Sequence, residues 1–152
     1  MTPAAAMPFT ALMGVAQYKQ QGAIGKFNQS VANRNAQVLE GQATQIEQKA
    51  EFDIAQFQKN FKKIEGETRV ALATSGVELG TGTSANIELS NAYEAKLQEN
   101  LIRYNSKVAA NNKQEEANFA TIKGQMARQE SKLAQINTIA STGSLLYGMK
   151  NT

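Results

Sequence analysis

Carboxylates and glycines are the residues of this chain with the greatest potential for chemistry. Glu115 and Glu116 are adjacent, but they lie in a polar run, which is not the buried setting that tunes a carboxylate for acid–base catalysis. Gly80 and Gly82 could cradle a phosphate, yet the strand and the Lys-Ser/Thr ending of a P-loop are missing. The chain has no Cys and no His, so thiolate nucleophiles and the commonest general base are absent. We expect no enzyme, no catalytic residue, no cofactor and no metal site.

The positive charges are spread thinly along the chain. The formal net charge is +3 over 152 residues, and Lys62-Lys63 is the only adjacent basic pair. Sequence-independent nucleic-acid binding usually needs a basic cluster or stripe. The pattern therefore favours solvated helix faces, with weak nucleic-acid binding kept as an alternative.

The composition favours helices but supplies few large core residues. Apolar residues make up 41% of the chain and Trp is absent, while Gln and Asn together contribute roughly a fifth, above average usage. Gln and Ala lose little rotamer freedom in a helix. We expect one all-α domain that buries its apolar surface against neighbouring copies or partners, and not a compact monomer.

Two apolar stripes at helical spacing run along the chain on either side of its midpoint. Residues three or four positions apart share one face of a helix. The first stripe comprises Ile46, Ala50, Ile54, Phe57, Phe61, Ile64, Thr68 and Leu72; the second comprises Ile87, Leu97, Leu101, Tyr104, Val108, Phe119, Ile122, Met126, Leu133 and Ile136. No proline interrupts either stripe. Their length predicts a hairpin or coiled-coil assembly.

A glycine-rich break separates the two stripes. Ser75-Gly76 is a good helix stop, because glycine readily takes the left-handed conformation that ends a helix. Thr81, Thr83 or Ser84 could cap the next helix with its hydroxyl. The predicted fold is thus a long helical hairpin with a Gly/Ser/Thr-rich mid-chain turn. Its structural residues are Ser75, Gly76, Gly80, Gly82 and Ser84.

Three further glycines lie inside the helical pattern. Gly41, Gly66 and Gly124 each cost roughly 1 kcal/mol relative to Ala in a helix. They are either tolerated surface positions, or hinges and places of close helix approach; the sequence leaves both interpretations open.

The hypothesis divides the chain into five segments. An apolar, partly flexible N-terminal segment covers 1–25, and the first helical arm covers 26–74. The turn covers 75–83, the second arm 84–140 and a C-terminal tail 141–152. The most apolar section of the hairpin is the predicted assembly face, namely Phe57, Phe61, Leu97, Leu101 and Tyr104.

Both ends of the chain are small and semi-apolar. The N-terminal segment lacks the basic start of a secretory signal, and we expect Pro3 and Pro8 to break its start. The uncharged run over 9–17 is shorter than the roughly 20 residues that span a bilayer. Flexible or packing termini are one interpretation; membrane activity of several copies together is the other. The candidate membrane segments are represented by Phe9, Leu12, Val15, Leu145, Leu146 and Tyr147.

The order of these segments resembles that of a known family. An Asn/Ala/Gln-rich arm, "FNQSVANRNAQVLEGQATQIEQKAEFD", precedes "RVALATSGVELGTGTSANIELSNAYEAKLQENLIRYNSKVAANN". This is similar to the small internal virion proteins of short-tailed bacteriophages, also called ejection or internal core proteins. Their turn reads like "ALAASGVDVNSGS" and is followed by an "L…IRYN"-like segment. The matching residues here are Arg69 to Gly76, Val77, Gly82, Ser84 and Leu101 to Asn105, with Glu78 in place of the family's Asp.

The resemblance implies a virion protein that assembles as a ring or core on the portal inside the capsid. It further implies ejection into the host at infection and a contribution to a channel across the outer membrane for genome delivery. The implied partners are other copies of the chain, larger internal virion proteins, the portal and the host envelope, with packaged DNA nearby. The alternative is a permanent structural or scaffold coiled-coil protein of the virion with no membrane role.

Overall fold

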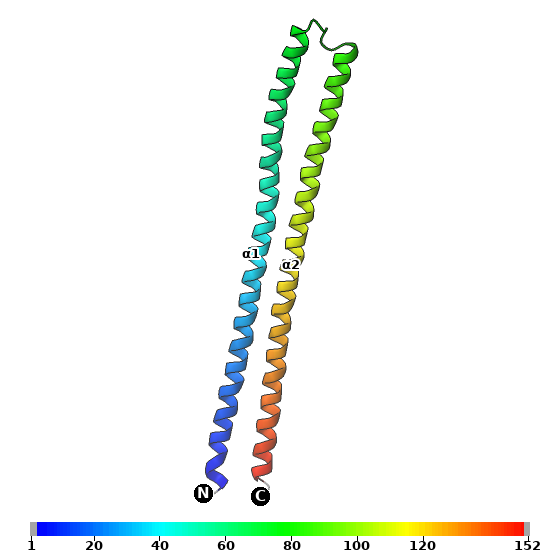
Figure 1. Cartoon of the computed structure of the whole chain (residues 1–152). Helices are drawn as coiled ribbons and strands as arrows, with labels where there is room; N and C mark the ends of the chain where they lie inside the picture. The colour runs from blue at the N-terminus through cyan, green and yellow to red at the C-terminus, as the bar shows by residue number, and fades with distance from the viewer. Residues whose placement is uncertain (1–2, 151–152) are drawn as a thin grey trace. The chain divides into compact units, whose positions relative to one another are not determined.

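Two long helices account for most of the chain in the computed structural model (Figure 1). Helix α1 spans Pro3–Thr74 and helix α2 spans Gly82–Lys150. The structure describes the backbone of residues 3–150 and the side chains of residues 11–145 and of Tyr147. No strand occurs within this described range, and the predicted all-α fold class is confirmed.

The helices contribute to two compact units. Unit 1 consists of Met1–Leu39 and Glu115–Thr152, and unit 2 consists of Glu40–Gln114. Each unit pairs a segment of α1 with a segment of α2. In unit 2 the two segments are joined by residues 75–81 and run antiparallel, which makes this unit a helical hairpin (Figure 1).

Both helices extend further than the sequence predicts. Residues 3–25 belong to α1 and residues 141–150 belong to α2, where we expected a separate N-terminal segment and a tail. Pro3 is the first residue of α1, a position where proline is tolerated because its missing N–H has no helical partner. The helix continues through Pro8, so the prolines do not break it. The Ala-rich start that follows Pro3 favours helix through its low entropy cost.

Helix α1 ends in a hydrogen-bonded glycine motif. Gly76 has a φ of 78°, and its N–H donates to the Ala73 carbonyl at 3.2 Å. The N–H of Val77 donates to the Leu72 carbonyl at 3.1 Å. This pair of bonds satisfies carbonyls that the last turn would otherwise leave without partners. The chain can therefore leave α1 sharply at this point.

Small side chains form the interior of each unit. In unit 2 the buried apolar residues are Ala43, Ala50, Ile54, Ala95 and Ala110. In unit 1 the interior contains Gly22, Gly25, Ala36, Ala117 and Gly124. Many of these positions are seven residues apart, the repeat that keeps one seam of a helix against its partner. In unit 1 the seam carries alanine and glycine where an ordinary coiled coil carries leucine; in unit 2 it carries alanine and one large residue, Ile54.

Candidate functional site

The helices of unit 1 approach closely at glycine. A Cβ atom on Gly124 would lie 2.7 Å from the Cβ of Ala32, and one on Gly14 would lie 2.6 Å from Oγ1 of Thr142. Gly41 and Gly66, in unit 2, have open space at the same position. Of the two interpretations of these glycines, close approach therefore applies to Gly124, and Gly41 and Gly66 are open surface positions.

Side chains of α2 also bind the backbone of α1 in unit 1. Arg128 donates from Nη1 to the Gly22 carbonyl at 3.1 Å, and Gln135 donates from Nε2 to the Tyr18 carbonyl at 2.8 Å. The hydroxyl of Ser131 donates to the Gln21 carbonyl. The short side chain of Ser131 reaches α1 because Gly25 faces it and permits a short distance between the helix axes.

The large apolar side chains of unit 1 lie on the outside of the helix pair. On α1 they form a stripe that we call the outer stripe of α1: Ile24, Phe27, Val31 and Val38. On α2 they form the outer stripe of α2: Phe119, Ile122, Met126, Leu133 and Ile136. Phe27 is 68% exposed and Phe119 is 64% exposed. The seam between the helices is filled by small residues, and these larger side chains stay largely exposed outside it.

The predicted assembly face divides between two places in unit 2. Phe57 and Phe61 are half-buried, with ring centroids 6.3 Å apart and stacked at 19°. Leu97, Leu101 and Tyr104 are exposed on α2, and Tyr104 is 66% exposed. The structure therefore does not bring these five residues together as one face. All ten residues of the second apolar stripe are exposed.

Polar groups supplement the small seam of unit 2. Glu99 is buried, accepts a 2.9 Å bond from Nε2 of Gln58 and forms a 3.3 Å ion pair with Lys96. The hydrogen bond from the Gln58 side chain is the main cause that holds the pKa of Glu99 below its ordinary value. Lys96 and the charge of Arg103 act in the same direction, and burial acts in the opposite one. Arg103 forms a 2.6 Å ion pair with Glu51 on the other helix segment.

The residues predicted to shape the turn lie at the connection between the helices. Gly80 and Gly82 have φ values of 82° and 51°, and Gly82 is the first residue of α2. The hydroxyl of Ser75 donates to the Leu72 carbonyl at 2.7 Å. Ser84 is fully buried, and its hydroxyl lies 2.7 Å from the Glu78 carbonyl and 2.9 Å from the Thr81 carbonyl. Ser84, two residues after the start of α2, thus links the first turn of this helix to the connection by hydrogen bonds.

The candidate membrane residues fall at the ends of unit 1. Leu12, Val15, Leu145 and Tyr147 are exposed, while the side chains of Phe9 and Leu146 lie outside those described. Within the described residues, neither helix contains a stretch apolar enough to cross a bilayer.

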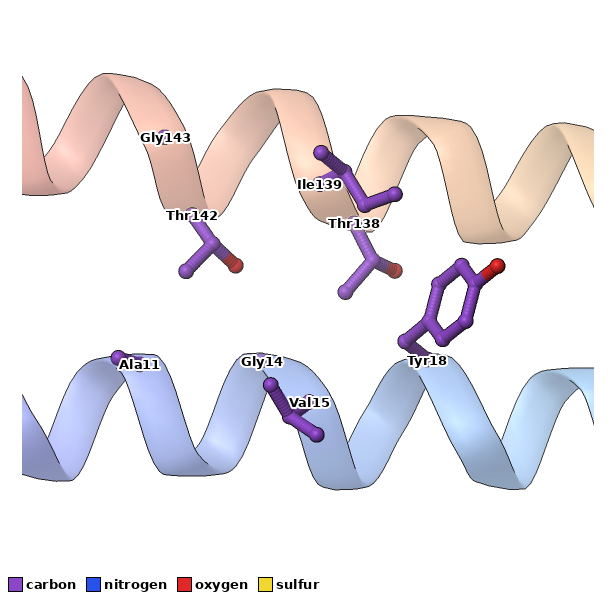
Figure 2. A pocket seen from close by; sticks show the side chains of 8 residues that line it. All are labelled: Ala11, Gly14, Val15, Tyr18, Thr138, Ile139, Thr142 and Gly143. Carbon is purple, nitrogen blue, oxygen red and sulfur yellow. The ribbon is translucent and has the colours of Figure 1, made fainter.

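A shallow apolar hollow of about 400 Å³ lies beside Val15 (Figure 2). Tyr18 lines it from α1, and Thr138, Ile139 and Thr142 line it from α2 (Figure 2). Gly143 leaves open space beside the hollow, whereas Gly14 lies in close contact with Thr142. The hollow offers an apolar surface, and none of its lining residues is an Asp, Glu, Lys or Arg.

No cluster of three acidic side chains that could hold a metal ion occurs among the described residues. No protein-family model, curated protein sequence or solved structure matches the chain. The outer stripes and the close helix seam are therefore the features on which a functional argument can rest.

Proposed function

We propose that this chain is a non-enzymatic assembly protein whose outer stripes pack against further copies of itself or against partner helices. The observation that carries this proposal is the separation of residue sizes. Alanine and glycine fill the seam of unit 1, and alanine together with Ile54 fills that of unit 2. Large apolar side chains such as Leu101 and Phe119 lie outside these seams. Monomeric proteins seldom expose continuous apolar surface of this kind.

The energetics of burial support the same proposal. Burying apolar surface contributes about 25 cal/mol per Å², so a seam of alanine and glycine stabilises a helix pair only weakly for its length. The outer residues hold most of the unburied apolar surface, including Tyr93 and Leu89, which are 68% and 71% exposed. Packing these residues against another copy would supply the stabilisation that the seam lacks.

The resemblance of the chain to internal virion proteins narrows the proposed role. We place the chain in an oligomeric ring or core on the portal inside a phage capsid. From there it is ejected at infection and contributes to a channel across the host envelope. Its partners in this role are other copies, larger internal virion proteins, the portal and the host outer membrane. The turn residues from Arg69 to Gly76 and the segment from Leu101 to Asn105 carry the resemblance.

Genome release from purified virions tests this role. The amount of the chain that stays with the particles would be measured by immunoblotting before and after release is triggered, with a capsid protein as the loading control. We expect the chain to leave the particles together with the genome. Retention of the chain in emptied particles would instead support a permanent scaffold.

A further inference from the structure

One face of unit 1 gathers five basic side chains. Lys19, Lys26 and Arg34 lie on α1, and Arg128 and Lys132 lie on α2. The first 39 residues of the chain contain no Asp or Glu. Four of the five side chains are exposed and Arg128 is half-buried. None of them forms an ion pair with a carboxylate among the described side chains.

Contacts across the seam place the basic residues of α1 beside those of α2. The guanidinium of Arg128 reaches the Gly22 carbonyl at 3.1 Å. Lys19 and Lys26 lie three residues before and four residues after Gly22, and residues at these spacings share a helix face. Arg128 therefore lies over the side of α1 that carries these two lysines.

A polar groove extends this face along α1. Lys26 and Arg34 line a hollow of about 480 Å³ together with Gln29, Ser30, Asn33 and Gln37. The lining contains no carboxylate and no large apolar side chain. Amide and hydroxyl groups thus lie between the two positive charges.

Lys132 lies on the same face, because residues on either side of it in α2 contact α1 there. It lies four residues after Arg128 and three residues before Gln135, whose amide reaches the Tyr18 carbonyl of α1 at 2.8 Å. Two side chains that bracket Lys132 at helical spacing therefore both reach α1 on this side.

The carboxylates of unit 1 lie elsewhere on α2. Glu130 is two residues from both Arg128 and Lys132, which places it roughly 200° around the helix from each. Glu116 is two heptads before Glu130 and shares its side of α2. Glu115 is one heptad before Ile122 and belongs to the line of the outer stripe. The face therefore carries five positive charges and none of these three carboxylates.

We propose that this cationic face binds the phosphate backbone of nucleic acid without sequence preference. Lys19 and Arg34 are separated by roughly 22 Å at the helical rise of 1.5 Å per residue, a length over which a nucleic-acid strand presents several phosphates. The amides of Gln29, Asn33 and Gln37 can donate to phosphate oxygens between the charged contacts.

A nucleic-acid backbone fits this face better than an anionic membrane surface. Helices that lie in a membrane interface place large apolar residues beside their cations. The outer stripe of α1 adjoins this face at Arg34, which lies three residues after Val31 and four before Val38. The groove between Lys26 and Arg34 is nevertheless lined by amides and a serine. The inference concerns binding chemistry alone and does not depend on the proposed role in ejection.

A salt titration of the intact chain with a short fluorescent DNA duplex tests the proposal. Each neutralised phosphate contributes about −0.9 to the slope of log affinity against log salt, so five contacts give a slope of about −4.5. The affinity should then fall about 500-fold between roughly 50 and 200 mM salt. The double variant K26Q/R34Q should make the slope less steep by about 2.

The double variant K62Q/K63Q is the matched control, because it removes the same charge from exposed positions of unit 2. We expect it to leave the slope nearly unchanged. Equal effects of both double variants, or absence of salt-dependent binding, would overturn the proposal. Tighter binding to phosphatidylglycerol vesicles than to DNA, with the vesicle binding sensitive to K26Q/R34Q, would overturn it in favour of a lipid surface.

Discussion

The end of α1 depends on the backbone conformation of one residue, Gly76. Its φ of 78° is a backbone conformation that alanine adopts only with strain. We expect Gly76→Ala to lower the free energy of unfolding by about 1 kcal/mol and to reduce assembly. Thr81→Ala is the comparison, since the Thr81 hydroxyl lies 3.5 Å from its acceptor and is exposed. Thermal unfolding measures both, and a larger loss for the threonine variant would contradict this account.

Gly124 and Gly41 form a matched pair of helical glycines. A methyl group on Gly124 would lie 2.7 Å from the Cβ of Ala32, whereas one on Gly41 meets nothing within 4 Å. We expect Gly124→Ala to destabilise the protein by about 1–3 kcal/mol through overpacking. Gly41→Ala should stabilise it by up to about 1 kcal/mol through helix propensity. Chemical denaturation of the two variants checks whether their changes in the free energy of unfolding have opposite signs. Equal changes would show that the helices at Gly124 are farther apart than the 2.7 Å contact implies.

Glu99 should make the stability of unit 2 depend on acid pH. Its pKa is lowered in the folded state by the Gln58 bond and the neighbouring Lys96. The charged form therefore stabilises the fold above the ordinary value of 4.5, and this stabilisation is lost as the pH falls through the lower folded value. We expect Glu99→Gln to flatten the fall in melting temperature between neutral and acid pH. Glu94→Gln, which changes an exposed carboxylate, should not flatten it.

At the scale of the helix, the exposed apolar residues of α2 in unit 2, Leu97, Leu101 and Tyr104, should control assembly and not helix formation. Leu97 and Leu101 are about half exposed and lie outside the seam. We expect the double variant L97Q/L101Q to keep its helical circular dichroism but to form smaller assemblies by light scattering. The double variant A43Q/A50Q is the contrast, because both alanines are buried in the seam. Loss of helix in the first variant would show that the leucines stabilise the helix pair itself.

The helices themselves follow from local features of the sequence. Long stretches without glycine or proline, such as 83–123, favour helix. Ser75-Gly76 combines a small polar residue with the residue type that tolerates positive φ. Helix α1 ends at Thr74, directly before this pair. The ends of the chain were harder to predict, because the small residues of 1–25 and 141–152 are compatible with both helix and coil.

The apolar stripes predicted the inner face of α1 in unit 2, where all of the first stripe except Ile64 is buried or half-buried, but not the inner face of α2. Hydrophobic periodicity identifies a face by its largest residues, and in α2 those residues, such as Phe119 and Leu133, lie outside. The seven-residue spacing of small residues, as in Ala36, Ala43 and Ala50, is the signal that marks the seam. The cationic face was missed for a related reason. Its charges are seven or eight residues apart in α1, and they meet those of α2 only in the fold.

At the scale of the whole molecule, the proposed assembly and the cationic face are compatible. The outer stripes of unit 1 lie mostly outside the shared seam, and the outer stripe of α1 adjoins the cationic face only along its Arg34 edge. In a head-to-tail contact, the outer stripe of α1 packs on the outer stripe of α2 in the next copy. Every copy in such an assembly is related to the next by the same rotation. Copies joined in this way would present their cationic faces on the same side.

Membrane activity is a property of several copies in this proposal, and it gives the last prediction. Small residues let helices approach closely in lipid, and polar side chains are tolerated there when they face a water-filled lumen. The purified protein should therefore release dye from liposomes with a steep dependence on its concentration. Val15→Asp or Leu145→Asp should suppress the release, because both side chains are more than half exposed and an aspartate there would face lipid.

The matched control is Val70→Asp, an exposed apolar position of unit 2 that is 67% exposed and outside both candidate segments. We expect this variant to release dye as the unmodified chain does. Equal suppression by all three substitutions would mean that added negative charge, and not the position, prevents leakage. Absence of leakage at every concentration, with and without the partner virion proteins, would leave the permanent scaffold as the better account of the outer stripes.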